Sequence, residues 1–255
     1  MSKLEARNVC LSFGSVRVTD DISMAFEGGA RYAIIGPNGA GKTTFFNLLA
    51  GNLRPDSGRI FADGVDITAK DPTSRARIGI ARSFQRNNLF NELPVRENLA
   101  IACALQERTA WSFWRPLTRY SGIYGEAERI AEQIGLQDDL STQVRHLSYG
   151  SQRQLEVALA LACRPKFLLL DEPTSDMSPQ ETAAMDKLIN DLPRELAIIV
   201  IENDMDIVLD FAEKITVLDY GRILDQGSAE HIRNSELVRE RYLGGTLQDA
   251  AGEQA

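Results

Sequence analysis

The sequence predicts an α/β fold, and three observations predict it. A short apolar run at residues 31–35 leads into a glycine-rich loop, and an apolar helical segment follows that loop. Two further apolar runs, at residues 167–170 and 197–201, have the length and composition of strands that are buried on both faces. Helical patterns alternate with these strands, which indicates a partly parallel sheet covered by helices.

The N-terminal segment predicts an antiparallel β part. Apolar and polar side chains alternate on both sides of a turn at residues 14–15, and a turn at Asp63 and Gly64 joins two short strands. The alternating apolar residues are Val9, Leu11, Phe13, Ile22, Met24 and Phe26.

A mainly helical pattern from about residue 86 to residue 150 interrupts the strands. We therefore expect one domain over residues 1–245, with an inserted helical subdomain, and a disordered tail at residues 246–255. The insert at 109–124 is rich in aromatic residues and has no clean period. It is either a loop that packs its aromatic side chains on its own lobe or a docking patch for a partner.

Composition limits the function classes. The 255 residues carry a net charge of −8, so we expect no nucleic-acid partner. The three cysteines stand far apart without metal-type spacing, which indicates a reducing compartment. The N-terminus has no apolar signal segment, and no apolar run approaches the ~18 residues that span a bilayer. We expect a soluble protein that can still dock on a membrane protein.

The glycine-rich loop at residues 34–44 reads I-I-G-P-N-G-A-G-K-T-T and stands between a strand and a helix, as a phosphate-binding loop requires. Its glycines let backbone N–H groups turn inward around phosphate oxygens, and the positive end of the helix dipole points to the same place. Lys42 can reach the β- and γ-phosphates, and Thr43 can hold Mg²⁺. The nucleotide-binding residues predicted here are Gly36, Pro37, Asn38, Gly39, Ala40, Gly41, Lys42, Thr43 and Thr44.

Two adjacent acids follow the buried run at residues 167–170. Asp171 leaves the strand at its carboxyl end, where α/β proteins place their ligands. Because neighbouring residues at a strand end point in different directions, Asp171 can face Mg²⁺ while Glu172 faces a water molecule. A glutamate so placed can accept a proton from water that attacks a phosphate.

A third segment, L-S-Y-G-S-Q at residues 147–152, opens a helix. With the loop and the paired acids, it resembles the nucleotide-binding subunit of ATP-binding-cassette (ABC) transporters over about residues 4–245. The resemblance implies a P-loop NTPase core of the ABC ATPase type, with the antiparallel β part and the inserted α-helical subdomain. Four stretches are similar to the ATPase subunits of branched-chain amino-acid importers: residues 81–85, 147–150, 201–205 and 241–244.

The resemblance assigns further roles. Phe13 matches the aromatic residue that stacks on adenine, although it also fits an inward-facing strand residue. Gln85 matches a loop glutamine that contacts Mg²⁺ or water and senses the transporter; the alternative is an amide that bonds backbone. Ser148 and Gly150 match the signature segment, which binds the γ-phosphate of ATP held by the other protomer. Ser148 also fits a plain helix N-cap, and both interpretations are compatible.

Three positions depart from the family pattern. Tyr149 replaces the commoner glycine, as in the importer subfamily, and Ser151 stands where a glutamine is usual. Asn203 stands where the family has a switch histidine. Asparagine donates a hydrogen bond but takes up no proton, so we expect ATP binding with reduced turnover. The alternative is that Asn203 only caps the next helix.

The sequence thus predicts an ATP-binding and ATP-hydrolysing subunit of an importer for branched-chain amino acids or related small solutes. Its cofactors are ATP and Mg²⁺. Its partners are a second ABC ATPase subunit, transmembrane permease subunits and, indirectly, a periplasmic solute-binding protein, at the cytoplasmic face of the inner membrane. The predicted catalytic residues are Glu172, Gln85, Asn203 and Lys42, and the predicted metal ligands are Thr43, Gln85 and Asp171. The alternatives are a weakly hydrolysing regulatory cassette and a non-transport ABC ATPase.

Overall fold

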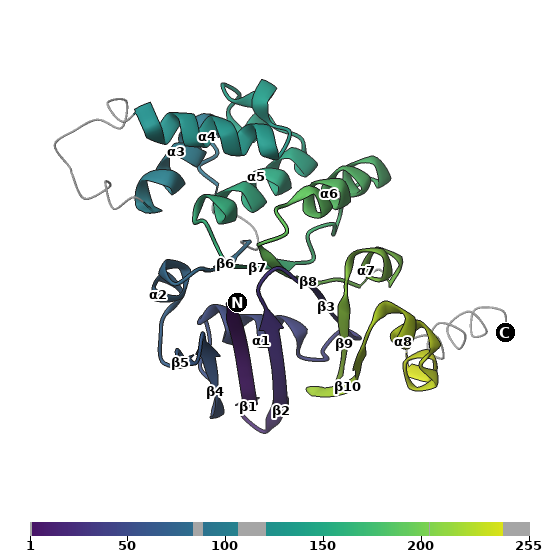
Figure 1. Ribbon diagram of the computed structural model, residues 1–255. Helices are drawn as coiled ribbons and strands as arrows, with labels where there is room; N and C mark the ends of the chain where they lie inside the picture. The colour runs from purple at the N-terminus through teal and green to yellow at the C-terminus, as the bar shows by residue number, and fades with distance from the viewer. Residues whose placement is uncertain (1, 84–88, 107–120, 204, 242–255) are drawn as a thin grey trace. The chain divides into compact units, whose positions relative to one another are not determined.

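The computed structural model describes residues 2–83, 89–106, 121–203 and 205–241 (Figure 1). Its contacts divide the chain into two compact units. The first unit comprises Met1–Pro72 and Arg194–Ala255, and the second comprises Thr73–Pro193. The predicted boundaries of the helical insertion, residues 86–150, stay a prediction. The predicted tail and most of the aromatic insert lie outside the described residues.

The first unit begins with the predicted antiparallel sheet. Its strands are β1 (Lys3–Phe13), β2 (Val16–Glu27), β4 (Ser57–Ala62) and β5 (Val65–Asp66), in the order β2-β1-β4-β5 (Figure 1). The predicted alternating apolar residues of β1 and β2 are buried, with one exception. Phe13, at the end of β1, is 52% exposed. The turn between β4 and β5 places Asp63 and Gly64 at positive φ, as the predicted two-residue hairpin turn requires.

The same unit contains a set of mainly parallel strands. β3 (Arg31–Ile35) pairs in parallel with β8 (Ala197–Ile201) on one side and β9 (Lys214–Asp219) on the other, and β10 (Arg222–Gly227) pairs antiparallel with β9. Every residue of β3 and β8 is buried, which explains their continuous apolar sequence.

The first unit also contains three helices: α1 (Lys42–Ala50), α7 (Met205–Phe211) and α8 (Ala229–Asn234). Residues of β3 and β9 form one apolar core with Val208 and Ala212, which lie in and just after α7, and Ile232 of α8. Gly51 ends α1 in the left-handed conformation that glycine adopts without strain.

The second unit is mainly helical. Its helices are α3 (Val95–Gln106), α4 (Ser121–Gln133), α5 (Tyr149–Ala162) and α6 (Pro179–Asp191), with short 3-10 helices at Gln137–Asp139 and Val144–His146. Helix α2 (Pro72–Arg77) starts at the boundary of the two units, and β6 (Ile80–Arg82) pairs in parallel with β7 (Phe167–Asp171). Among the described residues, no helix has the length and apolar character needed to cross a membrane.

Helix α2 and strand β6 were not predicted from the sequence. Both are short, and the three residues of β6 offer too few positions for a period to emerge. Helix α5 starts at Tyr149 with Ser148 as its N-cap, within the segment that was expected to open a helix.

Candidate nucleotide site

The glycine-rich loop has a conformation that only glycine adopts without strain. Gly36, Gly39 and Gly41 all have positive φ. A Cβ atom on Gly36 would lie 2.2 Å from the Leu218 carbonyl oxygen, and one on Gly41 would lie 2.4 Å from the Val18 carbonyl oxygen. The backbone at these two positions therefore approaches β9 and β2 too closely for any side chain.

The amide groups at the start of α1 face the same loop. Gly41 is the N-cap of α1 in the left-handed conformation, and no side chain caps the helix. The first N–H groups of a helix carry partial positive charge and attract anions. Lys42 adds a full positive charge on a side chain that is almost completely buried. Its Nζ donates hydrogen bonds to the carbonyl oxygens of Gly36 and Pro37 within the loop.

Neighbouring strands brace the loop. The Gly221 N–H, in the turn between β9 and β10, donates to the Ala40 carbonyl oxygen at 3.1 Å. The Gly221 carbonyl oxygen accepts a hydrogen bond from the Asp20 N–H of β2 at 2.7 Å. These bonds connect the loop to the β9–β10 turn and, through Gly221, to β2.

Two other predicted residues of the first unit lie near this loop. Phe13 ends β1 and pairs with Val16, two residues before the Val18 carbonyl that packs against Gly41. Its 52% exposure contradicts the alternative of a strand-core residue and leaves the ring open to stack on a ligand. Asn203 follows β8, whose Ile201 pairs with Ile34 at the start of the loop segment. The Asn203 N–H donates to Oε2 of the buried Glu202 at 3.2 Å.

In the second unit, β7 ends at Asp171, and all five residues of β7 are buried. The Nη2 atom of Arg82 lies 2.6 Å from Oδ2 of Asp171, and the side chains are only 11% and 1% exposed. Arg82 was not among the residues predicted from the sequence to serve the site. No signal pointed to it, because the pairing depends on the parallel register of β6 and β7, which joins Arg82 to Leu169.

Glu172 has a φ of 47°, in the left-handed region that residues other than glycine adopt at a cost. The Ser175 N–H donates to the Glu172 carbonyl oxygen at 3.2 Å, which closes a tight turn after β7. This turn begins at Glu172, directly after the strand residue Asp171.

The signature segment forms the start of α5. Ser148 is the N-cap, and its Oγ accepts a hydrogen bond from the Ser151 N–H at 3.1 Å, so the capping interpretation is confirmed. The Tyr149 hydroxyl donates to the Ser175 carbonyl oxygen at 3.4 Å, and the Arg153 guanidinium lies 5.4 Å from the Tyr149 ring centroid. Tyr149 therefore joins this segment to the loop that follows β7.

Two of the three predicted Mg²⁺ ligands carry oxygen atoms of the kind that Mg²⁺ prefers. No cluster of three His, Cys, Asp or Glu side chains suited to a metal ion occurs within the described ranges. A magnesium ion at a phosphate site needs few protein ligands, because water and phosphate oxygens fill the remaining positions. The Thr43 hydroxyl and the Asp171 carboxylate are hard oxygen ligands of that kind. Gln85, the third predicted ligand, lies outside the described residues.

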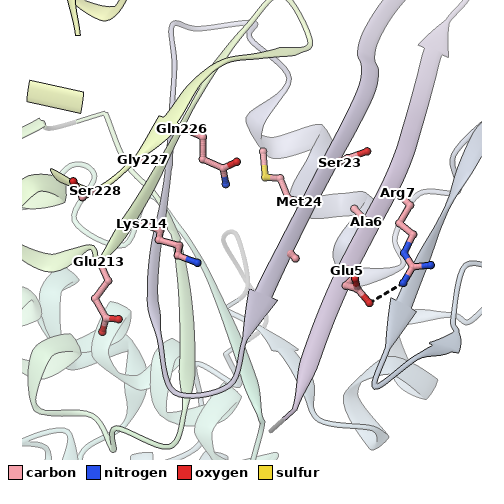
Figure 2. A pocket seen from close by; sticks show the side chains of 11 residues that line it. Glu5, Ala6, Arg7, Ser23, Met24, Glu213, Lys214, Gln226, Gly227 and Ser228 are labelled. Atoms are coloured by element: carbon pink, nitrogen blue, oxygen red, sulfur yellow. Dashed lines mark hydrogen bonds and ion pairs between the residues drawn. The ribbon is translucent and has the colours of Figure 1, made fainter. Parts of the chain in front are cut away.

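A separate groove of about 660 Å³ lies elsewhere in the first unit. Figure 2 shows Lys214 and Gln226 extending from the β9–β10 hairpin toward β2 and β1, where Glu5 pairs with Arg7. Lys214 opens β9 and pairs with Tyr32, so the groove lies at the opposite end of β3 from the glycine-rich loop. It is therefore not the predicted nucleotide site.

The glycine-rich loop lies between a parallel strand and a helix that no side chain caps, and it ends in a buried lysine. These features define a P-loop nucleotide-binding protein. Comparisons with known proteins narrow this class. A family model described as "ABC transporter" matches residues 19–175. The chain belongs to this family and is the ATP-binding subunit of a transporter.

Two curated relatives and one solved structure are similar along nearly the whole chain. LivG of Escherichia coli K12, a high-affinity branched-chain amino acid transport ATP-binding protein, is 35% identical and aligns with 94% of this chain and 97% of its own length. LptB of Haemophilus influenzae, a lipopolysaccharide export system ATP-binding protein, is 33% identical over 96% and 98%. The ADP conformation of MJ1267, an ATP-binding cassette of an ABC transporter, matches with a TM-score of 0.85, 28% identity, and coverage of 96% and 99%.

Proposed function

We propose that this chain binds and hydrolyses ATP to power the import of branched-chain amino acids or related small solutes. The observation that carries the proposal is the ordered P-loop, with its close glycine contacts and its buried Lys42. The family and the LivG likeness support the transport role.

In the proposed reaction, water attacks the γ-phosphate in line with the leaving ADP. Lys42 and the N–H groups at the start of α1 stabilise charge on the phosphate oxygens, and Phe13 stacks on adenine. Thr43, Asp171 and Gln85 would hold Mg²⁺, which would supply positive charge to the phosphates when bound. Glu172 orients the water and accepts its proton.

Two subunits would share each ATP. Ser148 and the N–H groups at the start of α5 would bind the γ-phosphate of a nucleotide held by the P-loop of the partner. Closing on ATP and opening after hydrolysis would drive permease subunits, and this chain would then act at the cytoplasmic face of the membrane. A periplasmic solute-binding protein would deliver the solute to those permeases.

The side chain of Asn203 determines the rate of ATP hydrolysis that we expect. A histidine at this position could exchange a proton with the attacking water, whereas the amide of Asn203 only donates or accepts a hydrogen bond. We therefore expect slow turnover with ordinary ATP binding, which keeps a regulatory, weakly hydrolysing role as the second interpretation.

The first experiment measures binding of a fluorescent ATP analogue to the wild-type chain and to Lys42→Ala. The substitution removes the charge that the P-loop presents to the phosphates, so affinity should fall by at least about tenfold. Lys70→Ala is the matched control, because Lys70 is an exposed lysine of the same unit. Equal affinity of all three proteins would contradict the proposed site.

The second experiment identifies the solute, because the likeness to LptB leaves lipopolysaccharide export as another candidate. Cells that lack the gene should lose uptake of labelled leucine and regain it with the wild-type gene but not with a Lys42→Ala gene. Normal leucine uptake together with a defect in lipopolysaccharide export would contradict the import proposal.

A further inference from the structure

The carboxylate of Glu181 contacts the start of the signature helix α5. Glu181 belongs to the first turn of α6, and its Oε1 accepts a hydrogen bond from the Gly150 N–H at 2.9 Å. Gly150 and Glu181 are 31 positions apart in the sequence. This contact therefore joins two helix N-termini that the sequence does not bring together.

The other oxygen of the same carboxylate completes the capping box of α6. Its Oε2 accepts from the Ser178 hydroxyl at 2.7 Å and from the Ser178 N–H at 3.1 Å. These bonds from Ser178, followed by the bond from the Gly150 N–H, hold the pKa of the Glu181 carboxyl below its usual range. Glu181 is therefore an anion at neutral pH.

The space around Gly150 points to the same contact. A Cβ atom added to Gly150 would lie 2.7 Å from Oε1 of Glu181 and 2.8 Å from its Cγ. Because Gly150 is inside a helix and does not need positive φ, its lack of a side chain serves this close approach. The glutamate thus lies directly against the glycine of the signature segment.

We propose that Glu181 is a positioning residue. Its carboxylate accepts the hydrogen bond from the Gly150 N–H until the γ-phosphate of the partner's ATP displaces it. The inference rests on the proposed function, in which the signature segment binds that phosphate. A helix N-terminus favours one anion at a time, so carboxylate and phosphate compete for the same amide. Glu181 thereby opposes closure of the dimer until ATP is bound, and the Ser178 bonds retain the carboxylate when it is displaced.

The test compares steady-state hydrolysis of MgATP by the full chain and by Glu181→Gln. Glutamine keeps the length and a hydrogen-bond acceptor but removes the charge, so it competes less well with phosphate. The KM for MgATP should fall by about 3- to 10-fold, the ratio expected when a charge-assisted hydrogen bond becomes a neutral one. The kcat should stay within about twofold, because the bond is lost before the chemical step.

Two control variants separate this role from a purely structural one. Glu230→Gln removes an exposed charge from the first turn of α8 and should leave KM unchanged. Ser178→Ala weakens the cap of α6 but keeps the carboxylate at Gly150, so KM should not fall. Sedimentation velocity with the non-hydrolysable analogue AMP-PNP should show Glu181→Gln forming dimers at a lower nucleotide concentration than wild type.

The outcomes are distinguishable. If folded Glu181→Gln has the KM and dimerisation of wild type, or a higher KM, the positioning role is wrong while the ATPase proposal stands. If the wild-type chain neither binds nor hydrolyses ATP, the proposed function is wrong and the positioning role fails with it.

Discussion

The guanidinium of Arg82 lies 2.6 Å from the carboxylate of Asp171 at the end of β7, and both side chains are largely buried. Asp171 is the proposed Mg²⁺ ligand, so the carboxylate that would hold the metal has a cation beside it in this structure. A buried carboxylate is stable only with compensating charge or hydrogen bonds. Arg82 supplies that compensation and links β6 to the proposed metal site.

Removing Arg82 should destabilise the protein strongly. Arg82→Met keeps much of the side-chain volume but leaves the Asp171 carboxylate without its charged neighbour. We expect the free energy of unfolding to fall by roughly 3–5 kcal/mol, the cost of breaking a buried ion pair from one side. Urea unfolding followed by circular dichroism measures the change.

The matched control is Arg96→Met. Arg96 pairs with Glu128 at 3.0 Å in the same unit, but both side chains are about half exposed, so the loss should be about 1 kcal/mol or less. The double variant Arg82→Met with Asp171→Asn should recover part of the stability that Arg82→Met loses. Equal losses for Arg82→Met and Arg96→Met would show that the buried pair is not a stabilising feature.

The capping box of α6 predicts a moderate change in the free energy of unfolding. The Ser178 hydroxyl accepts a hydrogen bond from the Glu181 N–H and donates one to the Glu181 carboxylate. Ser178→Ala should lower the free energy of unfolding by about 1 kcal/mol, and Ser178→Gly by only a few tenths. Denaturant titration of both variants checks the order; an alanine variant as stable as wild type would contradict it.

The sequence predicted the local features of this structure well. The glycine-rich loop and the strand that ends at Asp171 both lie within short segments whose pattern is local. The family resemblance and the fold class are confirmed by the comparisons. The roles of the predicted site residues stay predictions.

Contacts between distant segments could not be predicted in this way. The Arg82–Asp171 pair and the Gly150–Glu181 hydrogen bond join residues 89 and 31 positions apart. Neither follows from a period or a motif, because each depends on how one strand or helix packs beside another. Phe13 is the opposite case: alternation alone left it as a possible core residue, and its position at the exposed end of β1 excludes that alternative.

Asn203 gives a prediction of increased activity. If a proton-exchanging group at this position speeds hydrolysis, Asn203→His should raise kcat by about tenfold or more with little change in KM. Positioned acid–base groups contribute roughly 10²–10⁴-fold in enzymes, so a gain of about tenfold in kcat is a minimum that lies below this range. Steady-state phosphate release measures it.

Asn203→Gln serves as the control, because it changes the side-chain length without adding a group that titrates near neutral pH. It should give no increase. If Asn203→His is no faster than wild type, the explanation that Asn203 limits turnover is wrong. Asn203 would then be a structural residue after β8.

The most direct test of the central claim compares ATP hydrolysis by the wild-type chain and by Glu172→Gln. The glutamine variant should bind ATP with wild-type affinity, because Glu172 is not proposed to hold the nucleotide. Its turnover should fall by about 10²-fold or more, since the amide cannot accept a proton from water. Retained binding with nearly abolished phosphate release is the predicted result; turnover at the wild-type rate would contradict the account.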